Sequence, residues 1–273
     1  MSSSKSEFLN DLVTKPATRR SFMKTVTASG ITIAGAGLLG SSVLGIATEA
    51  FAQSGITDAD IINFALNLEY LEAEFYSVAS TGATLERRGL LPNSATTGPT
   101  LGGHAVPFGH ADSIAFLASA IMRDEIHHVQ FLRAALGSLA VKKPEINLDA
   151  LGFGFGTDQE FLLLSRAFED TGVSAYGGAA GLIQNKTFLE AAARIAETES
   201  QHSGAIRLKV INRGAHSPAV DGKDVPPTPN NVFFVDSQGL AIPRTTREVL
   251  NIVYHGGAHS GGFFPQGLNG TIR

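Results

Sequence analysis

The chain has 273 residues, of which 43% are apolar and 17% charged, and its formal net charge is −4. These values suit one folded domain with appendages and exclude a disordered or fibrous chain, and the acidic balance predicts no nucleic-acid partner. The sequence has no cysteine, which excludes thiolate nucleophiles, disulfides, iron–sulfur clusters and cysteine zinc sites. Any metal must therefore bind to His, Asp or Glu side chains.

Residues 1–52 have the features of an export signal. The segment TRRSFMK at 18–24 resembles a twin-arginine signal, and an uncharged run at 25–48 follows it. The sequence AFA that ends at Ala52 then forms an A-x-A-like cleavage site. We expect the twin-arginine export machinery to bind this segment, and cleavage near Ala52 to leave a periplasmic or other extracytoplasmic protein. An uncleaved N-terminal anchor and a core helix are the alternatives for these residues.

Two helices are predicted in the first half of the mature chain. The first extends from an N-cap at Thr57 to about Ser80, because its apolar residues recur at spacings of three and four. These residues are Ile61, Phe64, Leu68, Leu71 and Phe75. The second helix extends from an N-cap at Asp112 to a C-terminal stop at Gly137.

Two more helices are predicted in the second half. The third begins at Thr157 and the fourth at Thr187. Each threonine has a glutamate three residues later, Glu160 or Glu190, as in a capping box. We expect the third helix to be less regular in its second half, because each glycine in a helix interior destabilises the helix by about 1 kcal/mol relative to alanine. The glycines in this segment are Gly172, Gly177, Gly178 and Gly181.

The connections between these helices differ in length. Residues 82–111 form a long loop rich in Gly, Pro and Thr, residues 138–156 form a second long connection, and residues 185–187 form a tight turn. A long link between the second and third helices permits a crossover. The sequence therefore predicts an all-α four-helix bundle at 53–212 with a long crossover connection.

The last part of the chain is an irregular tail. Residues 213–273 are rich in Pro and Gly and too irregular for a domain with its own core. Thr245, with Glu248 three residues later, indicates one short helix. We expect this tail to wrap the bundle.

The two halves of the predicted bundle carry the same polar residues. In the first and third helices a tyrosine follows a glutamate by seven residues. In the second and fourth helices a histidine follows a glutamate by three residues. An arginine follows the same glutamate by eight residues. The repeat consists of Glu69, Tyr76, Glu125, His128 and Arg133, and then of Glu169, Tyr176, Glu199, His202 and Arg207. Residues three apart share a helix face, so each Glu–His pair can point at one place.

The four repeated glutamates interrupt apolar stripes, which places their carboxylates in the core. Buried carboxylates need compensating charge, because each desolvated anion is costly and like charges raise one another's pKa. Four glutamates with two histidines are the ligand set of di-iron and di-manganese bundles. We predict two divalent ions, iron or manganese, with Glu125 and Glu199 as bridges, Glu69 and Glu169 as terminal ligands, and His128 and His202 as one nitrogen for each metal.

Some neighbouring residues have competing interpretations. Glu72 lies on the same helix face as Glu69 and is its rival as a ligand. Tyr76 and Tyr176 are predicted to hydrogen-bond the ligand carboxylates, with an ordinary core role as the alternative. Glu74 is expected to be exposed.

Other polar residues are assigned to the outside of the bundle. We expect Glu197 to be exposed and His127 to lie on the surface or at an interface, because it points about 100° away from its neighbour His128. Arg133 and Arg207 are expected to pair with acids at the end of the bundle. The remaining histidines lack ligand spacing and are expected on the surface; they are His104, His110, His216, His255 and His259.

Five segments resemble the ferritin-like domain family that includes exported bacterial members and plant desiccation-related proteins. They are FALNLEYLEAEFY, DEIHHVQFLRAAL, RAFEDTGVSAY, AAARIAETESQHSGAIR and the tail segment GGFFPQGLNG. The resemblance covers about residues 57–273 and implies the same six ligands. It implies no single reaction, since the superfamily includes iron storage proteins, peroxidases, manganese catalases and oxygenases.

The leading hypothesis is an exported dinuclear metalloprotein that performs redox chemistry with dioxygen or peroxide, of peroxidase, catalase or ferroxidase type. The resemblance alone implies a role in oxidative or desiccation stress. The alternative is a non-catalytic envelope stress or binding protein that the metals only stabilise. Iron storage ranks third, because the long loop and tail suit a closed cage poorly. The sequence leaves a homo-oligomer open.

Overall fold

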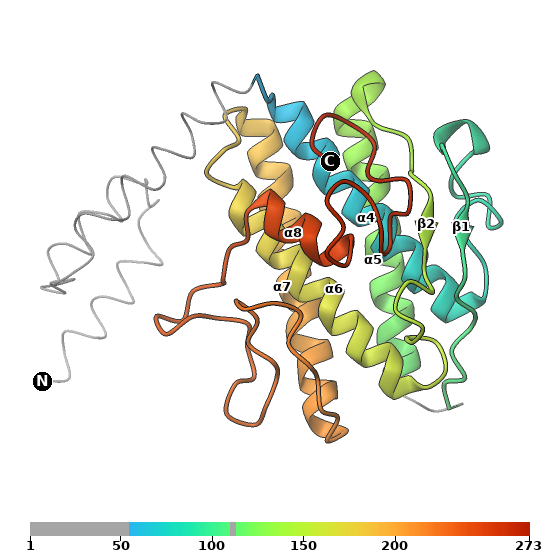
Figure 1. The fold of residues 1–273 in the computed structure, drawn as a ribbon, viewed down its shortest axis with the longest axis vertical. Coiled ribbons are helices and arrows are strands. Elements are labelled where there is room, and N and C mark those ends of the chain that lie inside the picture. Colours follow the sequence, from blue (N-terminus) through green and yellow to red (C-terminus); the bar gives the residue numbers. More distant parts are fainter. Residues whose placement is uncertain (1–54, 110–112) are drawn as a thin grey trace, which may run out of the picture. The chain divides into compact units, whose positions relative to one another are not determined.

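The computed structural model describes residues 55–109 and 113–273, and the described residues form one compact unit. Four long helices lie side by side, with irregular segments along them (Figure 1). This arrangement confirms the predicted all-α bundle. The export signal predicted at 1–52 and the N-cap predicted at Asp112 lie outside the described residues. Among the residues that are described, no helix is long and apolar enough to cross a membrane.

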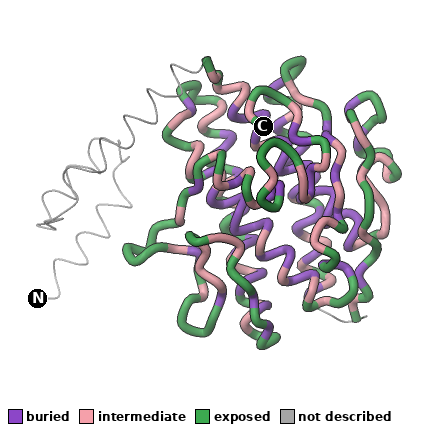
Figure 2. The backbone as a smooth tube through the Cα atoms, in the orientation of Figure 1, coloured by how far each residue is buried: buried purple, intermediate pink, exposed green. Residues whose placement is uncertain are grey.

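The first long helix, α4 (Asp58–Thr81), is the most deeply buried element. It begins at the predicted N-cap, where Thr57 accepts a hydrogen bond from the backbone of Asp60 and Asp60 accepts one from the backbone of Thr57. From residue 61 to residue 79 every side chain except that of Ala65 is buried. Figure 2 shows this burial along the helix. Other elements therefore enclose α4 on all sides.

The next two long helices each agree with a predicted end signal. Helix α5 (Ser113–Leu136) ends directly before the predicted glycine stop, and α6 (Asp158–Ala179) begins after its predicted N-cap, Thr157. Helix α6 continues through Gly172, Gly177 and Gly178 and ends before Gly181. Packing explains one of them, because a Cβ on Gly178 would clash with the carbonyl oxygen of Arg244 in the tail.

The fourth long helix, α7 (Lys186–Asn212), begins two residues earlier than predicted. Its N-cap is Asn185, whose side chain accepts hydrogen bonds from the backbone of Thr187 and Phe188. Asn is at least as good an N-cap as Thr. In addition, the backbone N–H of Asn185 donates to Asp58 at the start of α4 (2.5 Å), which fixes Asn185 in the capping position.

Contacts at the two ends of the bundle define the helix directions. The N–H of Gln184 donates to Asp58 (3.1 Å), so α4 begins where α6 ends. Gln184 lies in the link between α6 and α7, which is longer than the predicted tight turn. At the other end, Lys209 of α7 donates to Ser113, the first residue of α5 (2.7 Å). Helix α5 therefore ends at one end of the bundle, and α6 begins at the other. The predicted crossover between them runs the length of the bundle.

The two long connections contain only short regular elements. The first holds the 3-10 turn η1 (Asn93–Ala95) and strand β1 (Thr100–Leu101). The crossover holds the 3-10 turn η2 (Gly137–Leu139) and strand β2 (Ile146–Asn147). The two strands pair in parallel, so the connections support each other beside the bundle (Figure 1).

The tail packs on the bundle through hydrogen bonds. Its helix α8 (Thr246–Val253) begins at the predicted Thr245 with a complete capping box. The N–H of Asn269 donates to the side chain of Asn67 in α4 (3.2 Å). Arg207 of α7 donates to backbone carbonyls of the tail. The tail therefore covers part of the helices that carry the predicted ligands.

Candidate metal centre

The structure brings together the six residues predicted as metal ligands. Helices α4 and α6 contribute one glutamate each, while α5 and α7 each contribute a glutamate and a histidine on one helix face. All six side chains are buried: Glu69, Glu125, His128, Glu169, Glu199 and His202.

These side chains form two overlapping groups, each suited to one metal ion. Within a group, one ligand atom from each residue lies within 4.8 Å of all the others. One group contains Glu69 and His128, and the other contains Glu169 and His202. Glu125 and Glu199 belong to both groups. These two glutamates are the ones predicted as bridging ligands.

Glu125 divides its two oxygens between the groups. Its Oε2 lies 3.2 Å from Nδ1 of His128, and its Oε1 lies 3.0 Å from Nδ1 of His202. The same nitrogen of His128 lies 3.1 Å from Oε2 of Glu69 and 3.3 Å from Oε1 of Glu199. The two imidazole centroids are 6.2 Å apart. The carboxylate of Glu125 thus places one oxygen beside each of the two histidines.

Several buried polar atoms of this cluster have no hydrogen-bond partner among the described residues. They include Oε2 of Glu169 and both carboxylate oxygens of Glu199. Buried acceptors without partners are costly, and metal ions bound to these atoms would satisfy them. Carboxylate oxygen and imidazole nitrogen suit both iron and manganese. The residues present therefore fit a pair of such ions.

The pKa values show that the cluster requires positive charge. Burial raises the pKa of Glu69 to about 7, although the charge of His128 opposes the shift. Burial and the charge of Glu125 hold the pKa of Glu199 well above its usual range. Burial also acts on Glu125, but hydrogen bonds from His128 and His202 outweigh it and lower the pKa of Glu125 to about 2. Protons or metal ions must therefore balance these carboxylates.

Two tyrosines connect the halves of the centre crosswise. The hydroxyl of Tyr76 on α4 donates to Oε1 of Glu169 on α6 (2.5 Å), and the hydroxyl of Tyr176 on α6 donates to Oε1 of Glu69 on α4 (2.5 Å). The predicted hydrogen bonds to carboxylates are therefore present, and each one joins opposite halves of the repeat. The other carboxylate oxygen of each glutamate faces a histidine: Oε2 of Glu69 faces His128, and Oε2 of Glu169 faces His202.

Comparison with known proteins agrees with this geometry. The model of a family described as a ferritin-like domain matches residues 57–212, more than half of the chain. The chain belongs to the ferritin-like domain family. It is also similar to a protein named ferritin-like catalase Nec2 from Nesocodon mauritianus. The two are 25% identical over 278 aligned positions, which cover 80% of this chain and 86% of that protein.

This ferritin-like chain has a fifth buried carboxylate beside the six residues, that of Glu72. Burial and the charges of Glu199 and Glu125 hold the pKa of Glu72 well above its usual range. Glu72 belongs to neither of the two groups, whereas its rival Glu69 belongs to one of them.

Sequence reasoning missed Asp124, which contacts one of the predicted ligands. Oδ2 of Asp124 lies 3.2 Å from Nε2 of His202. The signal in the sequence was the position of this aspartate directly before Glu125. The second copy of the repeat has a threonine, Thr198, at the corresponding position.

The prediction that Glu74 is exposed is wrong. Glu74 is buried, and it accepts a hydrogen bond from the backbone N–H of Leu85 (3.1 Å). The ammonium group of Lys143, from the crossover, lies 3.8 Å from Glu74 and 3.1 Å from Glu86 of the first loop. The two long connections cover this face of α4, which the pattern of a single helix cannot show.

The two repeated arginines have different partners. Arg207 donates to Asp170 (2.6 Å) in a buried ion pair, which confirms the predicted pairing with an acid. Arg133 donates instead to the hydroxyl of Tyr70 (2.6 Å), so the prediction for Arg133 is wrong. The reason is that α4 has a tyrosine at the place where α6 has Asp170.

One further glutamate and five of the histidines predicted to lie outside the core are exposed in the described part of the chain. Glu197 and His127 are exposed, as predicted. The same holds for His104, His216, His255 and His259, while His110 lies outside the described residues.

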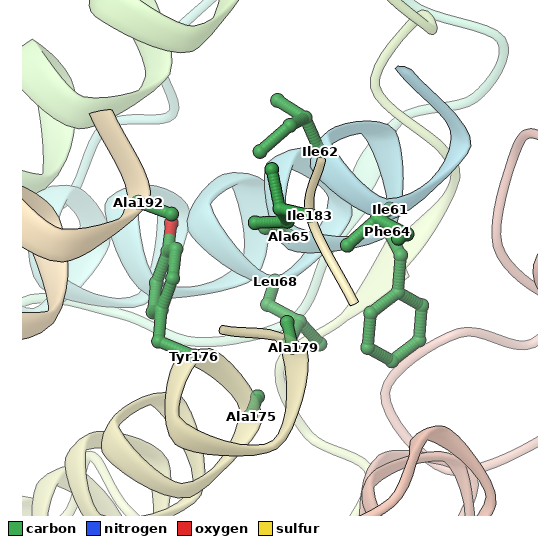
Figure 3. A pocket seen from close by; sticks show the side chains of 10 residues that line it. All are labelled: Ile61, Ile62, Phe64, Ala65, Leu68, Ala175, Tyr176, Ala179, Ile183 and Ala192. Atoms are coloured by element: carbon green, nitrogen blue, oxygen red, sulfur yellow. The ribbon is translucent and has the colours of Figure 1, made fainter. Parts of the chain in front are cut away.

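A small apolar cavity lies beside the centre, between α4, α6 and α7 (Figure 3). Its volume is about 10 Å³, and Leu68, Ala179 and Tyr176 are among the residues that line it. The hydroxyl group of this same Tyr176 holds Glu69. None of the lining residues is charged, so the cavity offers no further metal site.

Proposed function

We propose that this chain binds two iron or manganese ions within the bundle and uses them in redox chemistry with hydrogen peroxide. The observation that carries the proposal is that Glu125 turns one oxygen toward each histidine of the centre. The similarity to a ferritin-like catalase favours peroxide over dioxygen as the small oxidant. In the proposed reaction, one peroxide is oxidised to dioxygen and a second is reduced to two molecules of water.

The six buried side chains would hold the metal pair. The bound metals would supply a redox couple and Lewis acidity. The two tyrosines would keep the terminal glutamates in place, because each hydroxyl occupies Oε1 and leaves Oε2 for a metal. We assign Glu125 and Glu199 as bridges, Glu69 and Glu169 as terminal ligands, and His128 and His202 as one nitrogen ligand for each metal.

Charge balance supports two divalent ions. The four glutamates of the two groups carry four negative charges when ionised, and two divalent cations carry four positive charges. A single ion would leave an excess of buried negative charge, which is costly in a dry interior. Two divalent ions therefore balance the four glutamates of the two groups, to which Glu72 does not belong.

Oxygen evolution from hydrogen peroxide tests the proposal, after the chain has been loaded with Mn²⁺ or Fe²⁺. We expect activity in the wild type and its loss in Glu125→Ala, because this substitution removes the shared carboxylate. Glu197→Ala on the exposed side of α7 is the control and is expected to retain activity. Oxidation of added Fe²⁺, measured in parallel, distinguishes ferroxidase from peroxide chemistry.

Two results would contradict the catalytic part of the proposal. Bound metal without turnover would indicate the alternative of a non-catalytic protein that the metals stabilise. Equal activity in the wild type and in Glu125→Ala would show that the reaction takes place elsewhere.

We further propose that the chain is exported by the twin-arginine machinery and protects the cell envelope against oxidants. The support is the segment TRRSFMK at residues 18–24 and the cleavage-like sequence that ends at Ala52. Mass spectrometry of the secreted chain is expected to show a new N-terminus near Gln53. Replacement of Arg19 and Arg20 by lysine is expected to keep the chain in the cytoplasm.

A further inference from the structure

The two halves of the metal centre have matching ligand sets but different surroundings. Glu125 corresponds to Glu199 in the repeat, so the residue before it, Asp124, corresponds to Thr198. The carboxylate of Asp124 lies 3.2 Å from Nε2 of His202, the imidazole nitrogen that faces away from the shared carboxylate. This contact joins α5 to α7 at the edge of the centre.

The other half lacks this contact. The hydroxyl group of Thr198 donates to the carbonyl of Arg194 in its own helix (3.2 Å). Within the described part of the chain, every carboxylate near His128 faces its Nδ1 rather than its outer nitrogen. The two histidines are therefore unequal, although the sequence repeats the motif that contains them.

This difference has a direct consequence for metal binding. An Nε2–H of His202 that donates to Asp124 leaves the lone pair of Nδ1 directed at the centre. The carboxylate also fixes the ring orientation and makes the ligand nitrogen more basic. Removal of such an outer partner typically lowers metal affinity by about 10–100-fold.

The geometry points to two unequal metal positions, and we propose that the position at His202 fills first because Asp124 orients its imidazole. This inference rests on the proposed function, since it concerns the same pair of ions. Asp124 acts here as a positioning residue, because it reaches the metal only through the histidine. The side chain of Asp124 is 49% exposed, so its replacement by asparagine leaves the packing of the bundle intact.

The fifth carboxylate does not account for the same preference. Glu72 also breaks the repeat, because its counterpart is Gly172. However, the charges that act on Glu72 come from glutamates of both groups. Among the described residues, Asp124 is therefore the carboxylate that contacts the outer nitrogen of one ligand histidine and has no counterpart at the other.

Titration of the metal-free full chain with Mn²⁺ tests the inference, with electron paramagnetic resonance as the readout. An isolated Mn²⁺ gives a six-line spectrum, and a pair of neighbouring ions gives a coupled one. If the affinities differ by about 10–100-fold, about 60–80% of the chains hold a single ion at one equivalent, against about half for two equal independent sites.

Three variants make the test specific. Asp124→Asn is expected to weaken the first binding step by about 10–100-fold and to lower the fraction of singly loaded chains toward half. Thr198→Asp supplies the missing carboxylate and is expected to lower this fraction while raising the overall affinity. The double variant moves the carboxylate to the other half, and we expect it to restore the high fraction.

The outcomes separate this inference from the proposed function. Two ions that bind the wild type in one step, with no effect of Asp124→Asn, would overturn the inference alone. A wild type that binds no Mn²⁺ would overturn the proposed function and this inference together. A weakened first step in Asp124→Asn, with an unchanged melting temperature of the metal-free chain, supports the inference.

Discussion

Gly172 of α6 lies against Glu72 of α4, and the two residues have corresponding positions in the two halves of the repeat. A Cβ on Gly172 would lie 3.2 Å from Oε1 of Glu72 and 2.7 Å from Oε2 of Glu199. The missing side chain therefore provides the space for a fifth carboxylate beside the predicted bridge. This relationship explains a glycine that would otherwise only weaken α6.

Gly172→Ala is expected to destabilise the chain and to weaken metal binding. Alanine gains about 1 kcal/mol in a helix interior, but overpacking costs about 1–3 kcal/mol, and the contact with Glu199 displaces a predicted ligand. Gly204→Ala on α7 is the matched control, because no atom lies within 4 Å of the added Cβ. Thermal unfolding and Mn²⁺ titration measure both effects. A gain in stability in both variants would show that the space beside Gly172 has no role.

The crosswise tyrosines are expected to contribute equally to metal binding. Tyr76→Phe and Tyr176→Phe each remove one hydrogen bond to a predicted terminal ligand, and each is expected to lower metal affinity by about 10–100-fold. Tyr254→Phe is the control, since its hydroxyl accepts from the backbone of Leu268 in the tail. Calorimetric titration with Mn²⁺ compares the three variants. Unchanged affinity in both Tyr76→Phe and Tyr176→Phe would assign these tyrosines to ordinary core packing.

Glu74 is expected to make stability depend on pH. Burial and the neighbouring Glu86 raise the pKa of Glu74 from 4.5 to about 8. The folded chain therefore holds a proton that the unfolded chain has released between these two pH values. As a result, the free energy of unfolding falls as pH rises through this window.

Glu74→Gln resembles the protonated form, so its melting temperature relative to wild type is expected to be higher at pH 8.5 than at pH 5. Glu197→Gln on the surface is expected to show no such difference. An equal shift of Glu74→Gln at both pH values would contradict the assignment of the proton to Glu74.

The repeated arginines are expected to differ in their contribution to stability. Arg207→Leu leaves Asp170 as a buried charge without its main partner and is expected to cost about 3–5 kcal/mol. Arg133→Leu removes a hydrogen bond to the neutral Tyr70 and is expected to cost about 1 kcal/mol. Urea unfolding measures both values. Equal costs would contradict a stabilising contribution of the buried ion pair between Arg207 and Asp170.

The sequence predicts the helices and the six clustered residues because both depend on spacing within a helix. A glutamate and a histidine three residues apart share a face in any α-helix, so the repeat is sufficient to place Glu125 with His128. Contacts between elements depend instead on how the helices and loops pack. For this reason the pattern did not show that Lys143 covers Glu74, or that Asp124 reaches His202.

The start of α7 shows a second limit of sequence reasoning. Asn185 and Thr187 are both good N-caps, and the local sequence favours the one with a glutamate three residues later. A hydrogen bond from the backbone of Asn185 to Asp58, in a different helix, decides between them. A contact between residues so far apart in the chain carries no local signal.

The central claim is that Glu125 and Glu199 serve two metal ions at once. The most direct test is the metal content of the wild-type chain after loading with Mn²⁺ and removal of free ions, measured by elemental analysis. We expect about two ions per chain, as in dinuclear carboxylate bundles. One ion or fewer per chain would contradict the shared-carboxylate centre.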